Sequence, residues 1–168
     1  PLDMTQDIGA GPFRLPYRWR PLEWSVSGDD NVYCNERATA TQQSGFVFVA
    51  ECRNWLPDPI GGIFWFGVDD AATTVFNPMY CGITEIPECF KMGNGDMLTY
   101  SPTSAFWLFN MVANLCYQRY DLMSNDALKI QKRLESQYLS GISTADEAAL
   151  KLYEADEKKG LDYLTAYS

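Results

Sequence analysis

Two stretches in the first half of the chain, residues 45–51 and 63–68, are apolar at almost every position. A strand with both alternating faces apolar is typical of a sheet buried between two layers. Residues 56–62 contain two prolines and two glycines, which predicts a turn that pairs the two strands antiparallel. Residues 73–76, terminated by Pro78, are expected to form a third strand. The pattern predicts an antiparallel sheet with little water on either side.

The chain before this sheet divides at about residue 23. Residues 1–22 contain prolines and glycines too often for a long helix, which predicts an irregular lead-in. Residues 23–26 and 31–41 flank a polar turn at residues 27–30, so we expect a β-hairpin there. Its second arm is expected to continue into more sheet.

Helical periodicity takes over after residue 100. Ser101 followed by Pro102 is a favourable helix start, and the helix is expected to run to about residue 122. One face of this helix is apolar and carries Ala105, Phe109, Val112 and Cys116. A polar stripe, interpreted as the solvated side, carries Asn110, Asn114 and Gln118.

Two further helices are expected behind it. Ser124 is placed to cap one that stops near Gly141, and a capping box at Ser143 and Asp146 predicts another that stops near Gly160. The tail, residues 161–168, is expected to fray. The fold class is therefore α+β, an antiparallel sheet packed with helices. We expect one domain over residues 1–168, with a lead-in at 1–22, a strand-rich part at 23–80 and a helical part at 101–160.

Composition narrows the classes of partner. Of the 168 residues, 46% are hydrophobic and 21% charged, which is typical of a globular protein. The net charge of −9 disfavours nucleic acid as a partner because it repels a phosphate backbone. No run of about 18 apolar residues is present, so membrane insertion is not expected.

The residues available for chemistry are limited by the absence of histidine. Ser-His-Asp and Cys-His activation and every histidine metal site are thereby excluded from within the chain. The five cysteines form no CxxC pair, so neither a zinc site nor another cofactor is predicted. We interpret them as buried free thiols, and a disulfide between Cys81 and Cys89 stays open as the alternative.

Four residues are candidates for binding a substrate. Asn35 and Arg37 alternate onto one face of a predicted strand, where they either contact substrate or form a structural pair. Arg53 ends the most apolar strand and is suited to a carboxylate, although an ordinary salt bridge is an equal alternative. Asp69 begins an Asp-Asp pair at a strand end. Turn-forming aspartates exposed to water are the simpler interpretation of that pair.

Several of these segments together resemble the PepD-like cysteine dipeptidases, a family of N-terminal-nucleophile hydrolases. The resemblance covers most of residues 13 to about 140. It is carried by Asn-Glu-Arg-Ala at 35–38, residues 42–50 with Arg53, Trp-Phe-Gly-Val-Asp-Asp at 65–70, residues 75–81, and residues 104–110 with Asn114.

The resemblance implies a four-layer αββα sandwich, which agrees with strands that are apolar on both faces. It also implies hydrolysis of dipeptides or short peptides by an N-terminal cysteine. In such an enzyme the thiol attacks the amide carbonyl and the α-amino group of the same residue handles the proton, so no histidine is needed. An oxyanion hole would stabilise the tetrahedral intermediate.

The sequence departs from that pattern at its start, where residue 1 is Pro and no cysteine is near. We therefore expect a portion of a larger dipeptidase, inactive alone, whose nucleophile lies in a preceding segment. The chain would then hold no catalytic residue and would contribute Asn35, Arg37, Arg53 and Asp69 to substrate binding.

Two alternatives stay open. The first is a noncatalytic binding module that uses its aromatic residues, and the second is a structural subunit of a processed heterodimer. The expected partners are a dipeptide or short peptide and the preceding segment of the parent protein. An oligomer is left open, because an uncovered sheet face promotes self-association. A location outside the cytoplasm is favoured only through the resemblance.

Overall fold

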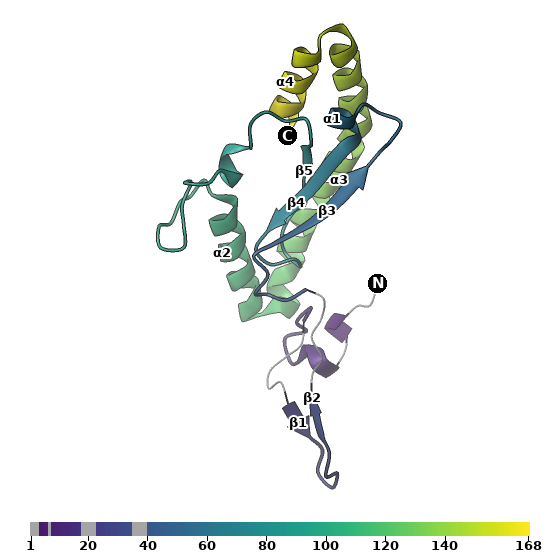
Figure 1. Cartoon of the computed structure of the whole chain (residues 1–168). Coiled ribbons are helices and arrows are strands. Elements are labelled where there is room, and N and C mark those ends of the chain that lie inside the picture. Colours follow the sequence, from purple (N-terminus) through teal and green to yellow (C-terminus); the bar gives the residue numbers. More distant parts are fainter. Residues whose placement is uncertain (1–3, 7, 18–22, 35–39) are drawn as a thin grey trace.

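The computed structural model describes residues 4–6, 8–17, 23–34 and 40–168 (Figure 1). Asn35 and Arg37 therefore lie outside the described residues. The lead-in contains two 3₁₀ turns, η1 (Met4–Gln6) and η2 (Ile8–Ala10), and no longer element in its described part. The chain is a mixed α+β structure, as predicted.

The two predicted hairpins are confirmed. Strand β1 (Glu23–Ser25) pairs antiparallel with β2 (Val32–Cys34), and Figure 1 shows this hairpin projecting away from the rest of the molecule. Residues 35–39 of its second arm lie outside the description, and residues 40–41 are not in a strand. Strand β3 (Phe46–Cys52) pairs antiparallel with β4 (Gly62–Val68), with the short helix α1 (Asp58–Gly61) in the turn between them.

The third strand is not where the sequence pattern placed it. Strand β5 is Asn77–Tyr80, which pairs with β4 on the side opposite β3, and residues 73–76 form a turn and an irregular segment. Pro78 lies inside β5 and does not end a strand. A proline is tolerated there because β5 is at the edge of the sheet formed by the described strands and pairs with β4 alone among them, so the N–H that proline lacks breaks no ladder.

The first long helix begins later and ends earlier than the sequence predicted. Helix α2 is Ala105–Gln118, and its N-cap is Ser104, which makes no side-chain cap. The hydroxyl of Ser101 instead bonds to the Asn94 side chain in the preceding loop, 2.5 Å away. The helix breaks at Arg119 because the lead-in packs there: the amide of Asp121 donates to the carbonyl of Phe13 at 2.9 Å.

The two predicted rear helices are one. Helix α3 (Tyr120–Ala155) continues without a break through Gly141 and Ser143. Helix α4 (Glu157–Tyr167) begins after its N-cap, Asp156, and includes Gly160. The expectation that these glycines end helices is therefore wrong, and so is the expectation of a frayed tail. A Cβ at Gly160 would lie 2.7 Å from the Cβ of Tyr153, so this glycine allows α4 to approach α3.

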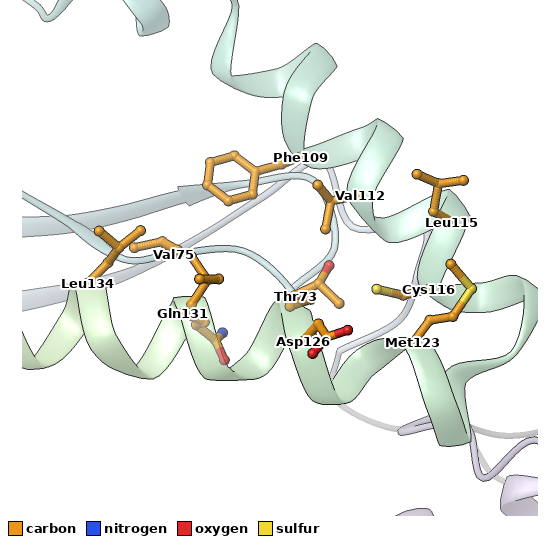
Figure 2. Close-up of a pocket in the computed structure, with 12 residues that line it drawn as sticks. Thr73, Val75, Phe109, Val112, Leu115, Cys116, Met123, Asp126, Gln131 and Leu134 are labelled. Carbon is orange, nitrogen blue, oxygen red and sulfur yellow. The ribbon is translucent and has the colours of Figure 1, made fainter.

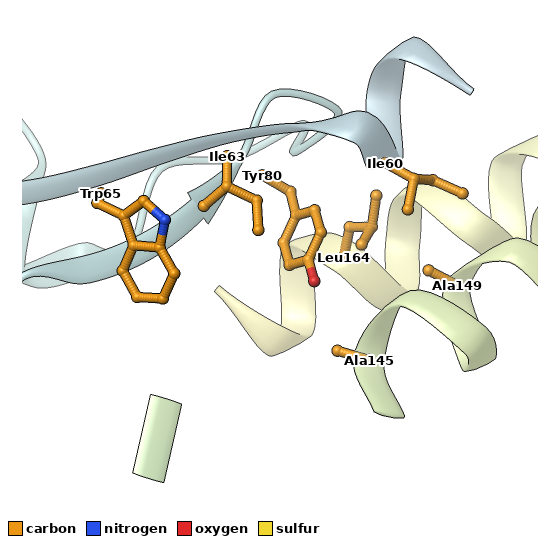
Figure 3. Packing of buried hydrophobic residues seen from close by; sticks show 7 residues of the cluster. All are labelled: Ile60, Ile63, Trp65, Tyr80, Ala145, Ala149 and Leu164. Carbon is orange, nitrogen blue, oxygen red and sulfur yellow. The ribbon is translucent and has the colours of Figure 1, made fainter. Parts of the chain in front are cut away.

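The main core lies between one face of the sheet and the α3–α4 pair (Figure 3). It is formed by Ile60, Ile63, Trp65 and Tyr80 from the sheet side and by Ala145, Ala149 and Leu164 from the helices. A second, smaller cluster fixes the lead-in to the α2–α3 junction through Leu15, Cys116 and Tyr120.

The opposite face of the sheet is uncovered at its β3 side, so the expectation of little water on either side is wrong for this chain. Phe46 and Phe48 are 61% and 53% exposed. They contact Phe64 and Phe66 of β4, and Phe90 of η3 (Glu88–Phe90) packs edge-on against Phe66. We call Phe46, Phe48, Phe64 and Phe66 the phenylalanine face. Apolar residues on both sides of the strands make both faces of the sheet apolar. Among the described residues, helices pack against one of these faces and not against the phenylalanine face at its β3 side.

Candidate functional site

A buried aspartate with a left-handed backbone lies at the end of β4. Asp69 has φ +64° and is 5% exposed, and its amide donates to the carbonyl of Gly45 at 2.9 Å. Aspartate tolerates this conformation better than most residues but still at a cost. A strained residue that the surrounding structure holds in place is characteristic of functional sites.

Helix α2 supplies the contact to the Asp69 side chain. The amide nitrogen of Asn110 donates to Asp69 Oδ1 at 3.0 Å, and the Asn114 amide donates to Asn110 Oδ1 at 3.1 Å. The polar stripe of α2, which the sequence pattern assigned to solvent, is thus directed in part at a buried carboxylate. Asn110 was missed as a site residue because helical periodicity shows which residues share a face but not what the face meets.

The neighbouring Asp70 is directed to a different environment. Its carboxylate accepts hydrogen bonds from the Tyr17 hydroxyl at 2.7 Å, the Thr73 hydroxyl at 2.8 Å and the Tyr117 hydroxyl at 3.4 Å. Asp70 is 1% exposed, and burial raises the pKa of its carboxyl although the hydrogen bonds oppose that rise. Burial together with Asp70 raises the pKa of Tyr17. The interpretation of the pair as turn residues exposed to water is therefore wrong for both aspartates.

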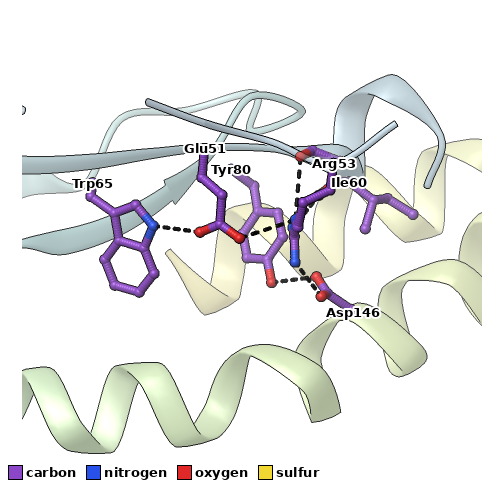
Figure 4. A network of polar contacts seen from close by, with 7 residues as sticks. Glu51, Arg53, Ile60, Trp65, Tyr80 and Asp146 are labelled. Atoms are coloured by element: carbon purple, nitrogen blue, oxygen red, sulfur yellow. Dashed lines mark hydrogen bonds and ion pairs between the residues drawn. The ribbon is translucent and has the colours of Figure 1, made fainter. Parts of the chain in front are cut away.

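Arg53 lies 7% exposed in a network within the chain (Figure 4). Its guanidinium pairs with the carboxylate of Asp146 on α3 and donates to the carbonyls of Ile60 at 2.7 Å and Gly61 at 3.3 Å. The Tyr80 hydroxyl donates to the other Asp146 oxygen at 2.8 Å. Burial opposes the charge of Arg53, yet the contact with Asp146 leaves its pKa raised. These contacts use the guanidinium to join the sheet to α3.

The network extends along the sheet. Glu51 lies 3.6 Å from the Arg53 guanidinium, and the Trp65 indole nitrogen donates to Glu51 at 2.8 Å. Asp146, the central acceptor, was expected only as a capping-box residue. It lies mid-helix instead, and only the packing of α3 on the sheet brings it to Arg53.

The structure does not bring Arg53 and Asp69 together. Arg53 follows the end of β3 and Asp69 follows the end of β4, and these strands are antiparallel over their seven residues. At about 3.3 Å per residue the two side chains are roughly 20 Å apart, at opposite ends of the hairpin. They do not contact one small substrate at the same time. The substrate-binding role of either residue stays a prediction.

An apolar cavity lies between α2, α3 and residues 73–75 (Figure 2). Its volume is about 390 Å³, and its lining is almost entirely apolar, with Asp126 at the rim. It contains none of the residues predicted to bind substrate. Cys116 borders it, but burial raises the pKa of that thiol and the nearby Asp70 adds to the effect.

The cysteines are free thiols, without the Cys81–Cys89 disulfide. Cys34, Cys52 and Cys81 are exposed, so the expectation of buried thiols is wrong for these three. Among the described residues no group of three or more acidic and thiol side chains is arranged to hold a metal ion. Within the same residues no helix is long and apolar enough to cross a membrane.

Comparison with known proteins bears on this arrangement directly. The sequence profile of peptidase family C69 matches residues 17–133, which is most of the chain and includes the whole sheet, α2, Asp69 and Asn110. The chain belongs to peptidase family C69. The C69 match ends within α3, so Asp146 and α4 lie beyond it.

The chain is similar in sequence to probable dipeptidase B of Lactococcus lactis subsp. lactis (strain IL1403). It is 25% identical over 120 residues, which cover 67% of this chain and 24% of the relative. The chain thus matches about a quarter of the length of that protein. No solved structure matches the chain significantly.

Proposed function

We propose that this chain is a portion of a cysteine dipeptidase that hydrolyses unblocked dipeptides and short peptides. Membership of peptidase family C69 carries the proposal, and the name of the matched relative, probable dipeptidase B, supports the substrate class. The nucleophile is an N-terminal cysteine outside this chain. Its own α-amino group takes the thiol proton as the sulfur attacks the scissile carbonyl, and the amide bond then breaks as that proton passes to the departing amine, which leaves a thioester. Water hydrolyses the thioester to release the carboxylic acid and regenerate the thiol.

Two thiols of the chain, Cys89 and Cys116, are unsuited to act as the nucleophile. Burial raises the pKa of Cys89 and of Cys116, so both are protonated at neutral pH. The thiolate is the nucleophile, and a raised pKa removes it. The amine needed as a base in place of histidine is likewise supplied by the residue that carries the nucleophilic thiol.

Asp69 is the residue of this chain that we assign to the substrate. It is a buried carboxylate at a sheet end, it lies within the C69 match, and no described cation pairs with it. A carboxylate in that state favours a cationic ligand, because among the described residues only the neutral amide of Asn110 donates to its side chain and no positive charge balances it. The free ammonium group of a dipeptide has the required charge. Arg53, whose guanidinium is engaged by Asp146, has a structural role in this proposal.

The phenylalanine face also fits the proposal. In an αββα sandwich it would pack against a second sheet contributed by the rest of the parent protein. The exposure of Phe46 and Phe48 in this chain supports that assignment, because large aromatic side chains in mutual contact are rarely left in water by a complete fold.

The test uses the complete protein that contains this chain, with its mature N-terminus determined by mass spectrometry. Amine release is measured from alanylalanine, alanylphenylalanine and leucylglycine. We expect turnover that disappears when the leading cysteine is replaced by alanine. Absence of turnover, or turnover indifferent to that cysteine, would overturn the proposal and favour the noncatalytic binding module.

The assignment of Asp69 is tested in the same protein. Asp69→Asn is expected to raise KM for unblocked dipeptides by about tenfold or more, because a hydrogen-bonded charge pair contributes roughly 1.5–3 kcal/mol. Asp162→Asn, an exposed aspartate on α4, is the matched control and should leave KM unchanged. Equal KM values for the two variants would remove Asp69 from the site.

A further inference from the structure

Helix α2 carries a ladder of side-chain amides that ends at Asp69. Gln118 donates to the carbonyl of Asn114 at 3.4 Å, and Asn114 donates to the carbonyl of Asn110 at 2.8 Å and to its Oδ1 at 3.1 Å. Asn110 donates in turn to Asp69 Oδ1 at 3.0 Å. Residues four apart on a helix are stacked along one face, so the ladder follows directly from the spacing of these amides.

The ladder fixes the orientation of the Asn110 amide. An asparagine side chain has one acceptor oxygen and one donor NH₂ group, and a carboxylate can only accept. The donation from Asn114 occupies the Asn110 oxygen and leaves the NH₂ group facing Asp69. The hydrogen bond from Asn114 and the hydrogen bond to Asp69 favour the same orientation of the Asn110 amide. Each of them alone would place the NH₂ group toward Asp69.

The two oxygens of Asp69 are consequently different. Oδ1 accepts from Asn110, whereas Oδ2 has no hydrogen-bond partner among the described residues. The residue is 5% exposed, yet the described structure contains no fully buried side-chain oxygen without a partner, so Oδ2 keeps access to solvent. A carboxylate that is held at one oxygen and accessible at the other is ready to accept a donor from a ligand.

We propose that Asn110 is a positioning residue: it fixes Oδ1 of Asp69, with its own amide oriented by Asn114, so that Oδ2 receives the ammonium group of the substrate. This inference rests on the proposed function for the identity of the ligand. Asn110 does not touch the reacting atoms. Its role is to hold one rotamer of Asp69, whose backbone is already fixed in the left-handed region by the bond to Gly45.

The experiment measures binding and not turnover. The complete protein, with its leading cysteine replaced by alanine, is titrated calorimetrically with the tightest-binding of alanylalanine, alanylphenylalanine and leucylglycine, and with the N-acetyl form of that dipeptide. Asn110→Ala should weaken binding of the unblocked dipeptide about tenfold, in line with the loss of one hydrogen bond to a charged group. Binding of the N-acetyl form, which has no ammonium group, should be the same in wild type and variant.

Three further variants separate positioning from a structural role. Asn114→Ala keeps Asn110 and removes only its orienting donor, and should weaken binding about threefold. Gln118→Ala, at the far end of the ladder, is the control and should have no effect. In the Asp69→Asn background, Asn110→Ala should cause no further loss, because the two residues act as one unit.

The outcomes are distinct. Weakened binding by Asn110→Ala that is absent in the Asp69→Asn background supports the inference even if the protein hydrolyses nothing, a result that would overturn only the proposed function. Asn110→Ala indistinguishable from Gln118→Ala overturns it. So does an equal loss for the N-acetyl dipeptide, an equal loss in the Asp69→Asn background, or no binding of any unblocked dipeptide.

Discussion

Asp69 and Asp70 are adjacent in the chain and have opposite surroundings. The left-handed backbone at Asp69 directs one carboxylate to α2, while Asp70 continues into the turn and meets the tyrosine hydroxyls of the lead-in and α2. Asp70 therefore ties three distant segments together and has no access to a ligand. Asp69 keeps one oxygen accessible, which is why we assign only Asp69 to a substrate.

The surroundings of Asp70 predict a dependence of stability on pH. Because burial raises the pKa of this carboxyl above its usual 3.8, the folded state binds the proton more tightly than the unfolded state. Its contribution to the free energy of unfolding is complete below about pH 4 and declines as pH rises through the raised pKa. Asp70→Asn does not titrate, so the stability of wild type minus that of the variant should fall as pH rises from about 4.

Urea denaturation at a series of pH values measures this difference. The control is Asp162→Asn, which makes the same substitution at an exposed position of α4. If the wild type gains stability relative to Asp70→Asn as the pH rises, the effect of burial on Asp70 has been assigned the wrong sign.

The pair between Arg53 and Asp146 predicts a large structural effect. Asp146→Ala would leave a guanidinium that is 7% exposed with Glu51, 3.6 Å away, as its remaining counter-charge. Breaking a buried pair by removing one partner costs about 3–5 kcal/mol, and the lower value is expected here because Glu51 stays. Lys159→Ala removes an exposed pair with Asp156 and should cost less than about 0.5 kcal/mol. Chemical denaturation compares the two. Similar losses would show that the Arg53 network adds no more than a surface ion pair.

Two glycines in helices α3 and α4 were wrongly predicted to mark helix ends. Gly141 and Gly160 look like helix stops because glycine is common just after a helix end. In the structure both lie inside helices where a tyrosine of the other helix approaches: Tyr167 faces Gly141 and Tyr153 faces Gly160. The requirement for a small residue is thus set by the packing of two helices and not by the end of either one.

The two glycines predict different responses to alanine. At Gly160 a methyl group would lie 2.7 Å from the Cβ and 2.8 Å from the Cα of Tyr153, and the backbone cannot move aside cheaply. Gly160→Ala should therefore destabilise the chain by about 1–3 kcal/mol despite the better helix propensity of alanine. At Gly141 the methyl group meets the far end of the Tyr167 side chain, with the hydroxyl oxygen at 2.9 Å, and a small swing of that ring about the Cα–Cβ bond relieves the contact. Gly141→Ala should be neutral or slightly stabilising.

Thermal unfolding followed by circular dichroism distinguishes the two variants, and each serves as the control for the other. Equal melting temperatures for Gly160→Ala and Gly141→Ala would contradict the close approach of α4 to α3.

On the scale of the molecule, the described residues cover one face of the sheet and leave the other open at its β3 side. The helices α3 and α4 bury Ile63, Trp65 and Tyr80, while the phenylalanine face stays open at its β3 side. Contiguous apolar surface of this kind favours association. We expect the chain to self-associate as its concentration rises, with the phenylalanine faces in contact.

Sedimentation velocity measures this association. Phe46→Ser combined with Phe48→Ser should shift the chain toward monomer, since both side chains are more than half exposed and neither belongs to the core. Met97→Ser, which alters a 91% exposed residue on a distant loop, is the control and should leave association unchanged. Association that persists in the double variant would mean that another surface is responsible.

Much of the local structure follows from the sequence. The hairpins at β1–β2 and β3–β4 were predicted because turn residues and alternating apolar residues act over a few positions. The α+β class and the helical second half follow from periodicity in the same way, and the dipeptidase family follows from motifs that the family comparison bears out.

The rest was decided by contacts between segments far apart in the sequence. Residues 73–76 resemble a strand, but Asp70 binds Thr73 in a turn and Thr74 accepts the amide of Val68, so pairing shifts to β5. The helix break at Arg119 depends on the lead-in. The contact of Asn110 with Asp69 joins residues 41 positions apart, and that of Arg53 with Asp146 joins residues 93 apart.

The sequence by itself thus determined the α+β class, the two hairpins, the helical second half and the family to which the chain belongs, because short-range propensity and motif spacing are properties of neighbouring residues. Only the tertiary structure decided that Asp69 is buried in a left-handed conformation beside Asn110, that Arg53 is held by Asp146, and that one face of the sheet stays open. Those features depend on which surfaces pack together, and a one-dimensional pattern specifies the apolar surfaces without specifying their partners.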